Sequence, residues 1–166
     1  MSAAPLHDVQ QISTPEQHAA LAHPVRQRLL FALQRQPSTI SRLAAQLGVN
    51  KGGVSHHLKV LRETGLVREA GTRQVRGGTE QYYALTARRL LVTDPQPENT
   101  AALLDAVAQE IERSPADHML TLRHLRLSPA KAAQLAEQLA RLVDEAEEDA
   151  QGEPTHGVLV TLYQQA

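Results

Sequence analysis

The sequence predicts a mainly α-helical chain with a β-hairpin, followed by a small C-terminal α+β module. Aromatic residues make up only 2% of the chain against 42% hydrophobic residues, so the core must be built from Leu, Val and Ala, which favours helices. Two short helical patterns flank a tight turn at Gly48-Val49-Asn50, and a strand pattern with a glycine turn follows Gly65. Two alternating stretches in the last third predict strands around a further helix.

Composition excludes several classes of protein. The 166 residues contain no cysteine, which excludes disulfides, thiolate-bound zinc, thiol redox sensing and cysteine nucleophiles. No apolar run approaches the ~20 residues needed to span a bilayer. The start, MSAAPLHDVQ, lacks the charged and apolar regions of a signal peptide. We therefore expect a soluble cytoplasmic protein with no membrane partner.

The net charge of −1 hides an uneven distribution. Residues 1–92 contain 12 Lys/Arg and 5 Asp/Glu, whereas residues 93–166 contain 5 Lys/Arg and 13 Asp/Glu. A polyanionic partner is therefore expected for the first half only.

Residues 1–13 show no clear periodicity and are expected to form a loose N-terminal arm. A helix then begins at Thr14, where Gln17 can complete a capping box. His23-Pro24 interrupts its register, because the residue before proline avoids the α region. A second helix follows from Pro24 to about Gln34, with the apolar stripe Val25, Leu29, Leu30 and Leu33.

The two helices around the Gly48 turn predict a helix-turn-helix. Thr39 caps the first helix and Gly48 ends it; Asn50 caps the second helix and Gly65 ends that one. Neither helix could bury its apolar face alone, so both must pack on the helix that begins at Pro24. The inward residues are Ile40, Leu43, Ala44 and Leu47 in the first helix, and Val54, His57, Leu58 and Leu61 in the second.

The opposite face of the second helix is small, polar and positive. It carries Lys51, Gly52, Ser55, His56 and Lys59 and no acidic residue, as expected for a helix that enters a DNA groove. Ser and His side chains can both hydrogen-bond to phosphates or base edges. A solvated helix face is the plainer interpretation. A catalytic Ser/His pair is not expected, because adjacent helical residues point about 100° apart.

Further residues extend the predicted DNA contacts. Gly52-Gly53 could let the helix N-terminus approach a phosphate, or could simply occupy first-turn positions that tolerate glycine. Lys59 and Arg62 are expected to contact phosphates, whereas Arg42 could equally be plain surface. His57 shares a face with Leu58 and Leu61 and is expected to be structural. The full predicted set is Thr39, Ser41, Lys51, Gly52, Gly53, Ser55, His56, Lys59, Arg62, Arg73 and Arg76.

A β-hairpin directly after such a helix pair is called a wing. Leu66-Val67 and residues 80–85 are strand-like, and Gly77-Gly78 between them predicts a turn. The tip, residues 72–80, carries Arg73 and Arg76 and no acid until Glu80. A basic hairpin of this kind suits phosphate contact or entry into a minor groove.

Three stretches, ALAHPVRQRLLFAL, STISRLAAQLGVNKGGVSHHLKVLRETGLV and TRQVRGGTEQYYAL, resemble the ArsR-type family of bacterial winged helix-turn-helix transcription regulators. The resemblance covers roughly residues 15–90. It implies a homodimeric repressor whose second helix enters the major groove of a palindromic operator. Two features differ from the family: the thiolate metal-sensing motif on the Thr39–Leu47 helix is absent, and the wing is longer and richer in glycine.

The segment Asp94-Pro95-Gln96-Pro97 predicts a stiff linker. We therefore place a DNA-binding domain at residues 14–93 and, at 98–166, a C-terminal module that serves dimerisation and is open to an effector. Asn99 is expected to cap a helix that runs to about Ile111. The resemblance makes this helix the first candidate for dimerisation, because the helix after the wing commonly pairs with its symmetry mate.

The rest of the C-terminal module reads as strand, helix and strand. Leucines alternate between Met119 and Leu127, a long helix begins at Ser128-Pro129, and Gly157 to Tyr163 alternates again. The acidic run Asp144–Asp149 is poorly placed at a helix C-terminus, where the dipole favours cations. It is expected to fray or to pair with arginines such as Arg123 and Arg126.

The eight histidines do not predict a metal site within one chain. His118 and His124 would lie about 20 Å apart on a strand, or point ~240° apart on a helix. A site that joins His118, His124 or His156 with the other subunit remains open. No cofactor is expected.

The sequence thus predicts a DNA-binding regulator, a homodimeric repressor of a palindromic operator, associated with the nucleoid and open to a small-molecule inducer. The alternative is a winged-helix protein that serves as a protein-interaction module or coats DNA without sequence preference. An enzyme is not expected, because no paired-carboxylate, phosphate-loop or metal-ligand constellation occurs.

Overall fold

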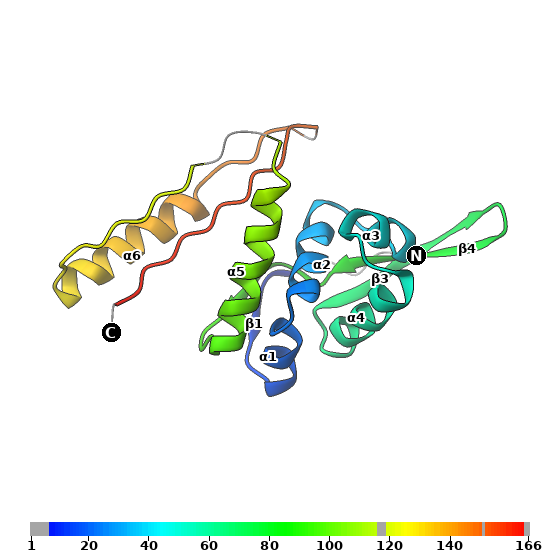
Figure 1. Ribbon diagram of the computed structural model, residues 1–166, viewed down its shortest axis with the longest axis horizontal. Helices are drawn as coiled ribbons and strands as arrows, with labels where there is room; N and C mark the ends of the chain where they lie inside the picture. Colours follow the sequence, from blue (N-terminus) through cyan, green and yellow to red (C-terminus); the bar gives the residue numbers. More distant parts are fainter. Residues whose placement is uncertain (1–6, 116–118, 151, 165–166) are drawn as a thin grey trace. The chain divides into compact units, whose positions relative to one another are not determined.

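The computed structural model describes residues 7–115, 119–150 and 152–164 of the chain, and they divide into two compact units within 1–118 and 119–166. The first unit holds five helices and five strands among its described residues (Figure 1). Their order is β1 (His7–Ile12), α1 (Pro15–Leu21), α2 (Pro24–Arg35), β2 (Ser38–Thr39), α3 (Ile40–Leu47), α4 (Lys51–Glu63), β3 (Val67–Val75), β4 (Gly78–Leu85), β5 (Ala87–Val92) and α5 (Pro97–Glu112).

The helices begin where the sequence places capping residues. Thr14 and Gln17 form the expected capping box at α1, and the Thr39 hydroxyl accepts from Arg42 N at the start of α3. At α4 the Asn50 side chain accepts from Gly53 N at 2.7 Å. Each cap satisfies an amide that has no partner inside its own helix.

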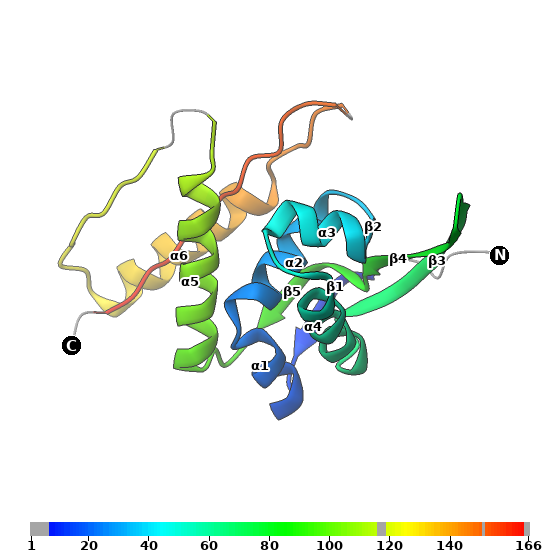
Figure 2. The same ribbon diagram turned by 45° about the vertical axis from the view of Figure 1, so that its right-hand side comes forward.

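The core lies where α2, α3 and α4 meet the first strand of the hairpin, and Figure 2 shows these helices packed together. Leu29 of α2, Leu43 of α3 and Leu58 of α4 are fully or almost fully buried. Leu66, just before β3, and Val67, its first residue, are buried in the same core. The predicted apolar stripes therefore point inward, and the three-helix packing is confirmed.

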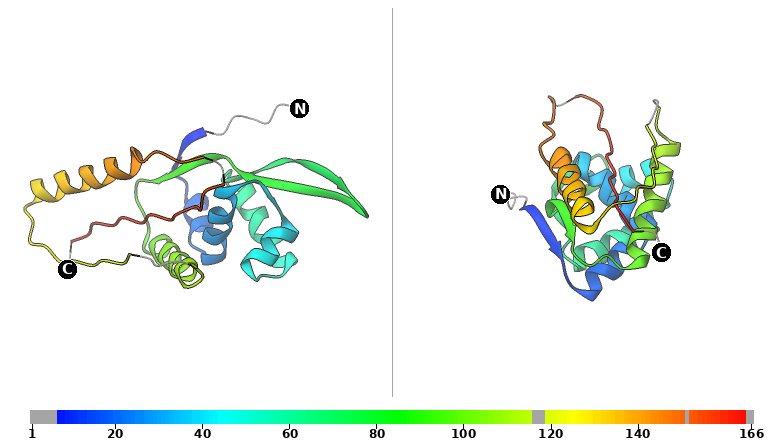
Figure 3. Two further views of the ribbon diagram at one scale, coloured as in Figure 1. Left: turned by 90° about the horizontal axis from the view of Figure 1, so that it is seen from above. Right: turned by 90° about the vertical axis from the view of Figure 1, so that its left-hand side faces the viewer.

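Two small sheets complete the first unit. One has the order β2-β4-β3 and is antiparallel; β3 and β4 form the hairpin, which projects beyond the helices (Figures 1 and 3). The other pairs β1 with β5 in parallel. The expectation of a loose arm at 1–13 is therefore wrong for residues 7–12, because Ile12 is fully buried in the core and β1 takes its hydrogen bonds from β5.

Helix α5 belongs to the first unit, and the division expected at residues 94–97 does not occur there. The helix packs on α1 and α2, and Arg35 of α2 pairs with Glu110 at 3.3 Å. The cap of α5 is Gln96 rather than Asn99. Asn99 is instead buried, and its side chain donates to His18 O at 2.6 Å, which attaches α5 to α1.

The second unit contains one helix, α6 (Pro129–Asp144), among its described residues. Ser128 caps it as expected, its side chain accepting from Lys131 N. The strands expected at 119–127 and 157–163 are not formed within the described range: both segments lack strand pairing (Figure 1). Alternation alone does not produce a strand, because a strand needs a neighbour for its backbone groups.

Candidate nucleic-acid interface

Helices α3 and α4 form a helix-turn-helix around a three-residue turn. Gly48 ends α3 in the left-handed conformation with φ of 67°, which glycine adopts without steric cost. The Arg28 guanidinium of α2 donates to Leu47 O at 2.7 Å and satisfies a carbonyl at the end of α3. The backbone conformation of Gly48 and the hydrogen bond from Arg28 therefore both hold the turn that leads into α4.

Helix α4 presents two different faces. Val54, Leu58 and Leu61 are at most 1% exposed and hold the helix on the core. The predicted outer set is exposed along its whole length: Lys51, Gly52, Ser55, His56 and Lys59. This face is free to meet a ligand without disturbing the core.

The glycine pair at the start of α4 has unequal surroundings. A Cβ on Gly53 would lie 3.2 Å from Val49 Cγ1, tighter than ordinary contact, because the capping turn folds over this position. A Cβ on Gly52 would meet only Asn50 Oδ1 at 3.4 Å. Packing therefore gives a reason for glycine at position 53 but not at position 52.

The cations of the outer face have acidic neighbours. Lys59 Nζ lies 3.8 Å from Glu63 Oε1, and Arg62 donates to the Glu69 carboxylate of β3. The first pair could be found from the i, i+4 spacing on one helix. The second could not, because it joins a helix to a strand. Both pairs are exposed and therefore weak, so a phosphate could replace the acid.

His57 lies on the inner side of α4, as expected. Its ring centroid is 4.5 Å from that of His23 and 5.4 Å from that of His56. Burial, followed by the nearby His23, Arg26 and His56, lowers the pKa of His57 to about 4. Its Nδ1 is buried and has no hydrogen-bond partner among the described residues. The ring is thus held neutral and takes a structural position.

The wing carries both predicted arginines on exposed positions. Arg73 stands across from Glu80 in the ladder, and Arg76 lies in the two-residue connection between Val75 and Gly78. The side chain of Gln74 donates to Thr79 Oγ1 at 2.9 Å and braces the hairpin near its tip. The predicted turn at Gly77-Gly78 is confirmed, with φ of 106° at Gly77.

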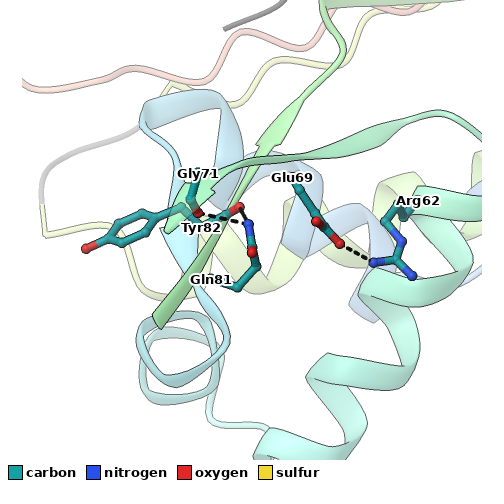
Figure 4. A network of polar contacts seen from close by, with 5 residues as sticks. All are labelled: Arg62, Glu69, Gly71, Gln81 and Tyr82. Atoms are coloured by element: carbon teal, nitrogen blue, oxygen red, sulfur yellow. Dashed lines mark hydrogen bonds and ion pairs between the residues drawn. The ribbon is translucent and has the colours of Figure 1, made fainter. Parts of the chain in front are cut away.

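A β-bulge sets the direction of the wing. The ladder slips between Glu69 and Gly71, and Gly71 has φ of 121°, a conformation that other residues rarely adopt. The Gln81 side chain donates to Gly71 O at 2.8 Å and to Tyr82 O at 3.0 Å (Figure 4). Sequence reasoning missed Gly71 and Gln81, because the bulge depends on strand register.

Two predicted residues at the start of α3, the capping residue Thr39 and Ser41 in the first turn, have different surroundings. Ser41 is exposed. Thr39 is 3% exposed, pairs with Tyr82 in the sheet, and uses its hydroxyl as the helix cap. Thr39 is therefore a structural residue and is not offered to a ligand, which corrects its inclusion in the predicted set.

The described residues contain no group of three His, Cys, Asp or Glu side chains that could hold a metal ion. His118, one of the histidines considered for a site between subunits, lies outside the described residues. No helix in the described part of the chain is long and apolar enough to cross a membrane.

Comparison with known proteins finds a family to which the helix-turn-helix is similar. Residues 23–69 match the model of the family described as bacterial regulatory protein, arsR family. A curated relative from Synechocystis sp., a transcriptional repressor SmtB homolog, is 37% identical over 86 residues. That alignment covers 52% of this chain and 60% of the relative, so the chain spans less than two thirds of its length.

Solved structures with likeness to this chain carry similar descriptions. The transcriptional repressor BigR from Xylella fastidiosa is 24% identical, with 59% of this chain and 84% of that chain covered and a TM-score of 0.37. The homodimeric winged helix-turn-helix domain Mb0332 from Mycobacterium bovis is 26% identical, with 60% and 82% covered and a TM-score of 0.36. The similarity to the arsR family rests on the sequence match over residues 23–69 and not on these likenesses.

Proposed function

We propose that this chain, which carries an ArsR-type winged helix-turn-helix domain, regulates transcription by binding a specific DNA sequence as a homodimer. The observation that carries the proposal is the outer face of α4. The side chains on this outer face are exposed, small and basic, while those on the opposite face of α4 are buried. A helix with these two faces can enter a major groove while its inner face stays packed on the core of the domain.

Each part of the interface has a separate task in this proposal. Ser55 and His56 reach base edges, because both carry hydrogen-bonding groups on exposed positions of α4. Lys51 and Lys59 contact phosphates, which fix the register of the helix on the duplex. Gly52 lets the amides at the helix N-terminus approach a phosphate closely. Arg73 and Arg76 extend the contact from the wing to the flanking backbone or minor groove.

Dimerisation would let two α4 helices read a palindrome with half-sites about 10 bp apart or a multiple of that distance. Helix α5 supports this step. Ala101, Leu104 and Ala108 lie at i, i+3 and i+7 on its exposed side, and Leu104 is 47% exposed. An apolar stripe of this kind is suited to pair with its symmetry mate.

Repression is proposed because the curated relative is described as a repressor. A signal, if one acts, would reach the chain through residues outside α3 and α4. The chain has no cysteine, and its described residues contain no cluster of three metal-ligating side chains, so no metal-dependent step is proposed.

Selection of bound sequences from random DNA tests the proposal. A palindromic consensus is expected, and recovery without sequence preference would instead favour general DNA coating. Lys59→Ala and Arg76→Ala should each weaken binding several-fold and reduce the slope of log K against log salt by about 1. Lys131→Ala, at an exposed position on α6, is the matched control and should change neither quantity.

A further inference from the structure

The second unit has no hydrophobic core within its described residues. None of them is buried, and α6 contributes no buried residue. Met119, Leu120 and Leu122 are 93%, 81% and 71% exposed. A short unit cannot offset the entropy of ordering its chain without burying apolar surface. Exposed apolar surface of this extent marks contact with another molecule.

An open hollow of about 430 Å³ lies between α6 and the segment 157–163. Its wall is apolar except for Asp144 at the end of the helix. Further acids follow directly in the chain, at 145 and 147–149, and all of them are exposed. The hollow thus combines an apolar floor with an acidic margin. The apolar lining is Ala136, Leu139, Ala140, Val143, Val158, Leu159, Val160 and Leu162.

Segment 119–127 has the complementary character. Its leucines are interspersed with Arg123 and Arg126, and the segment contains no acid. Neither arginine forms an ion pair with a described residue, and neither do Glu147 and Glu148. One chain therefore carries both an apolar hollow with an acidic margin and a leucine-rich segment of the opposite charge.

The backbone of the same segment also lacks partners. Among the described residues no backbone hydrogen bond joins 119–127 or 157–163 to another part of the chain. Extended segments with free amides and carbonyls readily add to a neighbouring strand. The Gly157–Tyr163 segment carries no charge, so a basic neighbour would meet no repulsion along it.

We infer that segment 119–127 of one protomer docks in the hollow of a second copy of this chain, and that the second copy reciprocates. The leucines enter the apolar hollow, and Arg123 and Arg126 pair with the acids that follow α6 in the other protomer. A surface that carries both halves of a complementary pair is suited to a two-fold contact. This inference rests on the proposed homodimer and adds a contact separate from α5.

Two full-length charge variants test the reciprocal pairing. The first carries Arg123→Glu and Arg126→Glu, and the second carries Glu147→Lys and Glu148→Lys. Each homodimer then faces like charges, whereas a mixed dimer has attractive pairs at both contacts. We expect each variant alone to dimerise at least tenfold more weakly than the wild type by sedimentation. Native mass spectrometry of the mixture should show mixed dimers almost exclusively.

Random exchange gives mixed dimers at about one half of the total, and that result would overturn the inference. The matched control reverses the ion pair Arg62–Glu69, which lies within one chain and outside α5 and α6: Arg62→Glu mixed with Glu69→Arg should stay near one half. Docking of 119–127 in the hollow of its own chain also predicts no preference for mixing. A chain that carries all four substitutions should regain self-association, which excludes misfolding of the single-sided variants.

A second probe leaves Arg123, Arg126, Glu147 and Glu148 unchanged and alters the apolar hollow instead. Val160→Asp places an acid in the hollow and should weaken dimerisation at least tenfold, while Thr155→Asp, on an exposed position before the segment, should not. Equal dimerisation of all three proteins would overturn the inference. Binding to the selected DNA is measured in parallel, so loss of DNA recognition and loss of this contact are separate outcomes.

Discussion

The guanidinium of Arg62 donates a hydrogen bond to the carboxylate of Glu69, and so joins the last turn of α4 to strand β3 (Figure 4). Glu69 is the last residue in regular register before the bulge at Gly71. The pair therefore connects the helix proposed to read DNA with the base of the wing proposed to flank it. The same pair occupies Arg62, one of the predicted phosphate contacts.

Because Arg62 and Glu69 are paired, replacing each of them with alanine should change the affinity for DNA in opposite directions. Glu69→Ala should raise affinity for the selected operator about two- to tenfold, because it frees Arg62 and removes a negative charge near the phosphates. Arg62→Ala should lower affinity and the salt slope. The free energy of unfolding should change by less than about 1 kcal/mol in each, since the pair is exposed. Titration at two salt concentrations measures these effects, and equal losses in both variants would show that the pair only positions the wing.

The two glycines of α4 should respond differently to alanine. Gly52→Ala has room for its methyl group and should keep the melting temperature, yet weaken DNA binding by about tenfold if the helix N-terminus approaches a phosphate. Gly53→Ala should be less stable than Gly52→Ala by about 1 kcal/mol, because its methyl group crowds Val49 at the capping turn. Thermal melts and binding titrations on both variants decide this, and unchanged binding by Gly52→Ala would leave Gly52 with a local role only.

The bulge makes Gly71 a sensitive position. Gly71→Ala forces a side chain into a backbone conformation with φ of 121° and should cost about 1–3 kcal/mol of stability. Gln81→Ala removes two hydrogen bonds from the bulge but leaves the glycine, so it should cost less, about 1 kcal/mol. Urea unfolding gives both values. A tolerated Gly71→Ala would mean that the wing does not depend on this bulge.

The partly buried ring of His57 predicts a loss of stability in acid. Burial holds its folded-state pKa at about 4, below the unfolded value of about 6.5. Between these values the unfolded chain binds a proton that the folded chain does not, so stability falls as the pH drops from about 6.5 towards 4. The groups around the ring, His23, Arg26 and His56, offer no carboxylate to offset this.

His57→Leu should therefore lose less stability than the wild type between pH 7 and pH 5. Urea unfolding at both pH values measures the difference, with His7→Gln on an exposed position as the substitution control. A pH dependence identical to that of the wild type would show that His57 does not carry the effect.

Local sequence determined the helix pair and its two faces. Caps at Thr14, Thr39 and Asn50, the stop at Gly48 and the 3.6-residue periodicity depend on neighbours within one turn, so they can be read without tertiary structure. The exposed basic face of α4 and the hairpin turn at Gly77 follow from the same short-range rules. The resemblance to ArsR-type regulators depends on these residues, and the family match at 23–69 covers the helix pair but neither Thr14 nor Gly77.

Tertiary structure decided what depends on residues far apart in the chain. Residues 7–12 form a strand only because β5 supplies a ladder, and Thr39 is withdrawn from the surface by its pairing with Tyr82. Arg62 meets Glu69, and Gly71 bulges, because of a register that no local pattern contains. The apolar alternation at 119–127 and 157–163 predicts strands that are not formed. Apolar periodicity specifies which face of a strand is buried, but it cannot supply the partner that buries that face.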